Sequence, residues 1–305
     1  MIYLPQKVHI QEVVLRDGLQ NEKQLVSTEE KLKLIDRLIA CGLRQVEITS
    51  FVNPHLVPQM ADAEDLCNRL QQREGIMFSA LILSEKGLYR AMRCGMPQVG
   101  VYVSASETHS RRNSNRSIDE ALEEARRLIR KARQAGIKVR AGVMNAFGCA
   151  YEGKVPIGKV AELSDALLDA QPNEICLADT SGLGNPLQIK EVLNRVRSVT
   201  GVTPLSLHFH NTRGLGLANV FSALEEGIFS FDTSLGGLGG CPFIEGATGN
   251  IATEDTVSML HSMGVETGID LSALIGVSLD FEKVLGRTFP SLISHLYASL
   301  KADGS

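Results

Sequence analysis

The sequence predicts a parallel (β/α)₈ barrel with extra helices after it. Strand-like and amphipathic helix-like runs alternate eight times over about 260 residues. No break in composition marks a linker, and polar residues that are unusual for apolar strands stand where several strands end. A doubly wound open sheet is the competing fold. We therefore expect one domain over residues 1–305, with the barrel at about 5–265 and a helical extension at about 266–300.

The expected elements form eight strand–helix pairs. Apolar, β-branched runs predict strands at 7–14, 46–51, 77–83, 98–104, 139–145, 174–177, about 202–210 and 229–233. Periodic apolar residues predict helices at 27–41, 60–72, 85–94, 117–135, 158–170, 186–199, 218–226 and 253–263. Ser27 with Glu30, and Ser117 with Glu120, have the spacing of a capping box at a helix start.

Composition excludes several classes of protein. A hydrophobic content of 44% and a charged content of 22% are ordinary for a globular chain, and a net charge of −4 gives no electrostatic reason to bind nucleic acid or an anionic membrane. No apolar run approaches the roughly 20 residues of a membrane span, and the N-terminus lacks the pattern of a secretory signal. Six dispersed cysteines without a C-x-x-C pair indicate reduced thiols, so we expect a cytoplasmic protein.

The conspicuous stretch of the chain contains His208 and His210. Alternate residues of a strand point to the same side, so the two imidazoles point together and Phe209 points away. Two imidazoles at the outgoing end of a strand suit one divalent cation. The alternative for this motif alone is a pair of partly buried, hydrogen-bonded histidines.

Charged residues in or after the first two strands are further candidates. Asp17 offers a hard oxygen ligand and Arg16 a permanent cation for a developing enolate oxygen, although a surface ion pair at the Gly18 turn is the alternative. Glu12 and Glu47 are acids inside apolar segments. We interpret Glu12 as structural, paired with a barrel arginine, and Glu47 as functional.

A glycine-rich stretch at 236–242 follows the last strand. Four glycines in five residues allow close approach, so Cys241 would reach the site, whereas Cys41, Cys67, Cys94 and Cys176 fit an inert core. No Lys-Ser/Thr pair follows the glycines, which excludes a P-loop. Asn250 then carries a carbonyl oxygen that suits a metal.

Basic residues cluster in an expected loop at 111–116, after the fourth strand. Arg111 and Arg112 have no acidic partner within this loop. We therefore expect them to meet the phosphates of a large anionic ligand such as coenzyme A.

Several segments together resemble the 3-hydroxy-3-methylglutaryl-CoA lyase family, which belongs to the metal-dependent TIM-barrel lyases related to isopropylmalate synthase. They are Arg-Asp-Gly-Leu-Gln-Asn-Glu at 16–22, Glu-Ile-Thr-Ser-Phe at 47–51, His-Phe-His at 208–210, Gly-Gly-Leu-Gly-Gly-Cys-Pro at 236–242, Gly-Asn at 249–250 and Ala-Thr-Glu-Asp at 252–255. The resemblance covers about residues 5–270, and the glycine-rich segment is quite specific to the lyase branch. It implies a TIM barrel that binds Mg²⁺ or Mn²⁺.

The resemblance also implies a role for each matching residue. Four of them would be metal ligands: Asp17, His208, His210 and Asn250. The catalytic residues would be Asp17 and His208 together with Arg16, which holds the thioester or enolate oxygen, Glu47, which assists at the substrate hydroxyl, and Cys241, an acid/base.

This chain departs from the family pattern at four positions. Val14-Leu15 replaces Gly-Pro, Ala150 replaces Pro and Asn211 replaces Asp. We expect the first two departures to lie near the pocket and to affect the acyl group, and Asn211 to alter the surroundings of the metal ligands.

The implied reaction is a retro-Claisen cleavage of 3-hydroxy-3-methylglutaryl-CoA, or a close branched 3-hydroxyacyl-CoA, to acetyl-CoA and a keto acid, acetoacetate. The alternatives are a lyase for another acyl-CoA such as citramalyl-CoA, a Claisen-condensing synthase, and a non-catalytic acyl-CoA- or metal-binding barrel. Such synthases normally carry a further C-terminal domain, for which about 35 residues after Asp270 leave little room. We expect an acyl-CoA thioester as the partner, no nucleic acid or membrane, and a homodimer or higher homo-oligomer.

Overall fold

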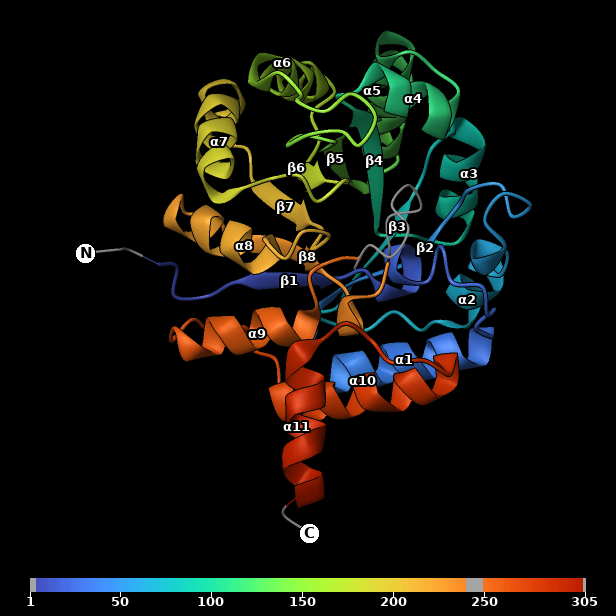
Figure 1. Ribbon diagram of the computed structural model, residues 1–305. Coiled ribbons are helices and arrows are strands. Elements are labelled where there is room, and N and C mark those ends of the chain that lie inside the picture. The colour runs from blue at the N-terminus through green and yellow to red at the C-terminus, as the bar shows by residue number, and fades with distance from the viewer. Residues whose placement is uncertain (1–3, 240–248, 304–305) are drawn as a thin grey trace.

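Eight parallel strands close into a barrel in the computed structural model, which describes residues 4–239 and 249–303 (Figure 1). Each strand pairs with the next in the chain, and the eighth pairs with the first. This confirms the predicted fold class. The strands are β1 (His9–Glu12), β2 (Gln45–Ser50), β3 (Met77–Leu81), β4 (Gln98–Ser104), β5 (Lys138–Met144), β6 (Glu174–Asp179), β7 (Leu205–Phe209) and β8 (Ser230–Thr233).

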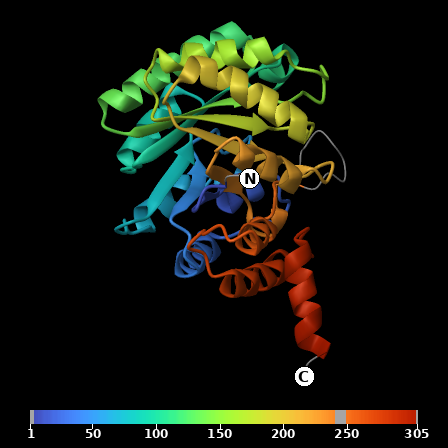
Figure 2. The same ribbon diagram turned by 90° about the vertical axis from the view of Figure 1, so that its left-hand side faces the viewer.

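Helices surround the barrel (Figure 2). They are α1 (Thr28–Ala40), α2 (Ala63–Arg69), α3 (Glu85–Arg93), α4 (Glu107–Ser114), α5 (Ile118–Gln134), α6 (Ile157–Leu168), α7 (Pro186–Thr200), α8 (Gly216–Glu225) and α9 (Thr253–Ser262). The capping box of Ser117 and Glu120 is present at the start of α5. At the start of α1, the Ser27 hydroxyl accepts a hydrogen bond from the Glu30 N–H, so this predicted helix start is also confirmed.

Two further helices, α10 (Leu271–Leu285) and α11 (Leu292–Asp303), form the predicted C-terminal extension. The α10 helix packs against α1 and α9, whereas α11 projects away from the barrel (Figures 1 and 2). None of the helices in the described ranges combines the length and the apolar character that a membrane crossing requires.

The apolar core lies between the strands and the helices, and polar side chains occupy the barrel interior. In β2, for example, Val46 and Ile48 are fully buried on the helix side, in the hydrophobic core. Glu47 points to the other side of the strand, because side chains alternate, and is 2% exposed. The same alternation in β5 and β8 places Arg140 and Asp232 inside the barrel, where their side chains pair.

Two segments differ from the predicted elements. The first strand ends at Glu12, and a π-helical turn, η1 (Val14–Gly18), follows it, because the Val13 carbonyl accepts the N–H groups of Asp17 and Gly18. The predicted loop at 111–116 is largely helix α4. Ser106 caps this helix by accepting from the His109 N–H, and Asn115 ends it in the left-handed conformation at φ 55°. Short 3₁₀ turns, η2 (Pro58–Met60) and η3 (Leu235–Gly237), complete the described elements.

Candidate active site

The η1 turn places Arg16 and Asp17 at the carboxyl end of the barrel, and Glu12 supports it. Oε1 of Glu12 accepts from the Val14 and Leu235 N–H groups, at 2.9 Å each, and Oε2 accepts from the Thr253 hydroxyl at 2.7 Å. The structural interpretation of Glu12 therefore agrees with its contacts, but the predicted arginine partner is wrong. Burial raises the pKa of Glu12 to about 8, against these hydrogen bonds.

Arg16 lies between two carboxylates. Its Nε donates to Oε2 of Glu47 at 2.6 Å, and its Nη1 contacts the Asp17 carboxylate. Burial raises the pKa of Glu47, although Arg16 opposes the shift. Burial acts on Asp17 in the same direction, but Arg16 and the two histidines outweigh it and hold the Asp17 pKa well below its ordinary value. Asp17 is therefore a carboxylate at neutral pH, as a metal ligand must be.

Asp17, His208 and His210 converge on one point. The Nε2 atoms of the two histidines are 3.1 Å apart, and they lie 3.9 Å and 3.7 Å from Oδ2 of Asp17. One donor atom from each of the three residues lies within 4.8 Å of the others, a spacing that fits a metal ion. Neutral imidazole nitrogens and a carboxylate oxygen form a common donor set for divalent metals. These three predicted residues therefore form a candidate metal centre.

Asn250 reaches this centre from the segment after β8. Its backbone bridges to His210, and its Nδ2 donates to Oδ2 of Asp17 at 2.7 Å and to the Leu238 carbonyl at 3.0 Å. Its Oδ1 is buried and has no hydrogen-bond partner among the described residues. The predicted carbonyl ligand thus lies beside the other three.

A buried ion pair of Asp232 and Arg140 holds His208 in place. We did not predict this pair from the sequence. Oδ2 of Asp232 lies 3.1 Å from Nδ1 of His208, and Oδ1 accepts from Arg140 at 2.6 Å. Burial opposes the charge of Asp232, but Arg140 and His208 keep its pKa below the ordinary value. The carboxylate therefore orients the His208 ring with Nε2 toward Asp17. Asp232 could have been found by the criterion used for Glu47, an acid inside a strand.

A cavity of about 280 Å³ opens above these residues. Arg16, Asp17, His208 and His210 line it. Leu81, Tyr102, Met144 and Thr180, in or directly after other strands, and His109 and Asn113 of α4 line it as well. The size suits the acyl part of a ligand.

One observation behind the expectation for Arg111 and Arg112 needs correction. Arg111 does have an acidic partner, because its Nη2 lies 2.7 Å from Oε1 of Glu107 one helical turn earlier in α4. Arg112 stacks on the Tyr151 ring, 4.3 Å from its centroid, and neither arginine lines the cavity.

The departures at Val14, Leu15 and Ala150 lie outside the cavity lining as well. Val14 and Leu15 are fully buried in the apolar core and do not line the cavity, although Arg16, the next residue, does. Asn211 accepts a hydrogen bond from the Gly216 N–H at the start of α8.

The cysteine predictions are only partly testable. Cys241 lies outside the described residues. Cys41, Cys67 and Cys176 are buried free thiols, as expected, whereas Cys94 is partly exposed.

The closed barrel and the polar cluster at its carboxyl end define a (β/α)₈-barrel protein with a candidate metal centre. The HMGL-like family model matches residues 7–280. A hydroxymethylglutaryl-CoA lyase of Bacillus subtilis is 42% identical over 94% of this chain and 96% of its own length. The chain belongs to the hydroxymethylglutaryl-CoA lyase family, a family of enzymes.

Solved structures agree with this assignment. The crystal structure of the Bacillus subtilis HMG-CoA lyase superposes with a TM-score of 0.94 at 41% identity, covering 97% of this chain and 99% of the other. An HMG-CoA lyase of Acinetobacter baumannii, solved with coenzyme A and 3-methylmalate, gives a TM-score of 0.91 at 38% identity, covering 97% and 96%. The second structure shows that a similar barrel binds coenzyme A.

Proposed function

We propose that this protein cleaves 3-hydroxy-3-methylglutaryl-CoA to acetyl-CoA and acetoacetate in a retro-Claisen reaction. The observation that carries the proposal is the convergence of Asp17, His208 and His210 beside Arg16 in one cavity. The similar proteins named above support the choice of substrate, since they are hydroxymethylglutaryl-CoA lyases and one of them was solved with coenzyme A.

We assign a divalent cation, Mg²⁺ or Mn²⁺, to the candidate metal centre. Asp17, His208 and His210 would hold it, and Asn250 would add Oδ1, which has no other partner in the described part of the chain. When bound, the cation supplies positive charge that lowers the cost of deprotonating a tertiary hydroxyl.

The chain's own groups then account for the proton and charge movements. Glu47, whose pKa is raised by burial, assists in taking the proton from the hydroxyl on C3. The bond between C2 and C3 breaks, C3 becomes the ketone of acetoacetate, and the electron pair passes into the thioester enolate. Arg16 is a fixed cation and stabilises the enolate oxygen.

The last step is protonation of C2 of the enolate, which yields acetyl-CoA. We assign this proton to the thiol of Cys241. The test is a Cys241→Ala variant, for which we expect a loss of turnover with little change in KM. Unchanged turnover would remove Cys241 from the mechanism without affecting the assignment of the metal ligands.

The deciding experiment for the reaction is an acetyl-CoA release assay with racemic 3-hydroxy-3-methylglutaryl-CoA. We expect release that EDTA abolishes and that added Mn²⁺ or Mg²⁺ restores. An Asp17→Asn variant should not recover, because it lacks the ligand charge. Release that persists in EDTA at the full rate would contradict the metal assignment, and absence of release under all conditions would contradict the substrate.

A lyase acting on a different hydroxy-diacid thioester is the second candidate. The Acinetobacter baumannii enzyme was solved with 3-methylmalate, a shorter hydroxylated dicarboxylate than 3-hydroxy-3-methylglutarate. A panel that includes citramalyl-CoA, with mass-spectrometric identification of the keto acid, separates the two candidates, because citramalyl-CoA would give pyruvate instead of acetoacetate.

We also propose that the chain forms a homo-oligomer. Leu292, Leu296 and Leu300 are exposed at intervals of four residues and therefore share one face of α11, the helix that projects from the barrel (Figure 1). Light scattering coupled to size-exclusion chromatography measures the mass in solution, and a monomer at micromolar concentration would contradict this proposal.

A further inference from the structure

Tyr102 occupies the barrel interior beside two glycines that leave room for its ring. A Cβ atom on Gly142, its register partner on β5, would lie 2.1 Å from both Cδ1 and Cε1 of the ring. A Cβ atom on Gly100, two residues earlier on β4, would lie 2.9 Å from Cε2. Any larger residue at either position therefore collides with the ring. The two glycines and the tyrosine form one packing unit.

The ring is also part of the cavity wall. Four residues form one row across neighbouring strands: Tyr102 on β4 is in register with Gly142 on β5, which is in register with Cys176 on β6 and, through it, with Ser206 on β7. The last three are buried. Tyr102 is the member of this row that keeps some accessible surface, and it lines the cavity together with Arg16 and His208. One edge of the ring lies against Gly142 and the other against Gly100, so the ring lies across the barrel interior beside the cavity.

The Tyr102 ring lies near the group that we place at the substrate hydroxyl. The position of a Cβ atom on Gly100 lies 2.9 Å from Cε2 of Tyr102 and 3.7 Å from Oε1 of Glu47. Burial raises the pKa of the Tyr102 phenol well above its ordinary value, so the ring brings no charge to this position. A carbon whose hydroxyl meets Glu47 therefore has an uncharged aromatic surface next to it.

We propose that Tyr102 contacts the acyl group of the substrate and limits the size of the branch on C3. The proposal rests on the proposed function, because it takes from it the placement of the C3 hydroxyl at Glu47. A methyl branch fits on the ring, and a longer alkyl branch collides with it. Tyr102 is thus a specificity-determining residue for branched 3-hydroxyacyl thioesters.

The test compares 3-hydroxy-3-methylglutaryl-CoA with its 3-ethyl homologue. We expect Tyr102→Ala to raise the ratio of kcat/KM for the ethyl over the methyl thioester by about 10-fold or more, the usual effect of one methylene in a pocket. Tyr102→Phe is the matched control, since it keeps the ring and should leave the ratio unchanged. A merely structural role for Tyr102 would lower both kcat/KM values by the same factor and leave the ratio where it was.

Gly142→Ala provides an independent check. In the presence of Tyr102 the new methyl group must displace the ring, so the ratio should change. In the Tyr102→Ala background the space is free, and the same substitution should have no further effect. Equal effects of Gly142→Ala in both backgrounds would overturn the proposal.

Binding measurements distinguish a failure of this proposal from a failure of the proposed function. If the unmodified protein cleaves neither thioester, the proposed function fails. Dissociation constants of the same two thioesters, measured by calorimetry in EDTA, then decide the role of Tyr102. We expect Tyr102→Ala to shift their ratio toward the ethyl compound, and an unshifted ratio in both binding and turnover would overturn the assignment.

Discussion

Nδ1 of His208 lies 3.1 Å from the carboxylate of Asp232, so the neighbouring strand β8 determines which nitrogen of this histidine faces Asp17. Such a carboxylate fixes the tautomer of the ring and makes its other nitrogen a better donor. The function of the candidate metal centre therefore depends on a residue that does not itself contribute a donor atom to it.

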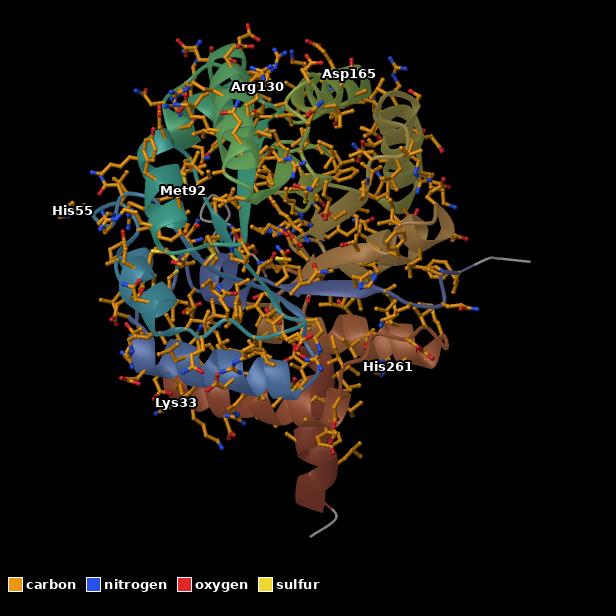
Figure 3. All side chains as sticks on the ribbon, turned by 180° about the vertical axis from the view of Figure 1, so that it is seen from behind. Lys33, His55, Met92, Arg130, Asp165 and His261 are labelled. Carbon is orange, nitrogen blue, oxygen red and sulfur yellow. The ribbon has the colours of Figure 1, made fainter. Side chains whose placement is uncertain are left out.

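An Asp232→Asn variant should bind Mn²⁺ about 10- to 100-fold more weakly, the usual cost of removing such a partner. Arg140 still has Glu174 at 2.9 Å, so its buried charge keeps one partner. Calorimetric titration with Mn²⁺ measures the effect. Asp165→Asn, on the outer side of α6, is the control and should bind normally (Figure 3). Equal affinities of the two variants would contradict the role of Asp232.

Arg16→Lys should lower kcat by about 100-fold or more, with a smaller change in KM. Lysine keeps the charge but loses the planar guanidinium, which contacts Glu47 and Asp17 at the same time. Steady-state kinetics give both constants, and thermal unfolding shows whether the fold survives. A variant that is folded and fully active would exclude Arg16 from the chemistry.

The expectation that Arg111 and Arg112 bind coenzyme A phosphates remains a prediction, and it implies an effect confined to KM. Alanine at either position should raise KM for the acyl-CoA several-fold and leave kcat unchanged, because the contact is remote from the reacting carbons. The increase should shrink with a thioester of 3′-dephospho-coenzyme A if the 3′-phosphate is the partner. Arg130→Ala, on α5, serves as the control (Figure 3). An unchanged KM in both variants would place the phosphates elsewhere.

Stability should fall with rising pH because of Glu12. Its pKa is about 8 in the folded protein against 4.5 for the free side chain, so the folded state binds the proton more tightly. This contribution to the free energy of unfolding is fully present below about pH 4.5 and is lost progressively up to about pH 8. Glu12→Gln removes this titration. The melting temperature of the variant should therefore fall less between pH 5 and pH 8 than that of the unmodified protein. Parallel melting curves for both proteins would contradict the assignment.

The fold was predictable because its signals are local and repeated. Apolar runs, capping boxes and the eight alternations each depend on neighbouring residues, and together they predicted the barrel. Helix α4 was missed because its sequence, Glu-Thr-His-Ser-Arg-Arg-Asn-Ser, has almost no apolar face. Its start is set by the Ser106 cap, a weaker signal than periodicity.

The candidate site was predictable only where a residue looked unusual in its own segment. His208 and His210, Asp17 and Glu47 satisfied that condition, and the barrel brought them together. The pairing of Asp232 with His208 depends on the register between β7 and β8, and its pairing with Arg140 on contact across the barrel with β5. The fit of Tyr102 against Gly142 likewise arises only when β4 lies beside β5. Such relations have no signature in a single sequence.

The π-helical turn after β1 carries Asp17, so the candidate metal ligands come from both ends of the barrel sequence. Asp17 belongs to the first strand–helix unit of the barrel, whereas His208, His210 and Asn250 come from its last quarter. An ion held by all of them would act as a cross-link between the two ends of the polypeptide, and a cross-link that closes a long loop strongly restricts the unfolded chain. Removal of the metal would then weaken the contact between the first and the last strands, where the barrel closes.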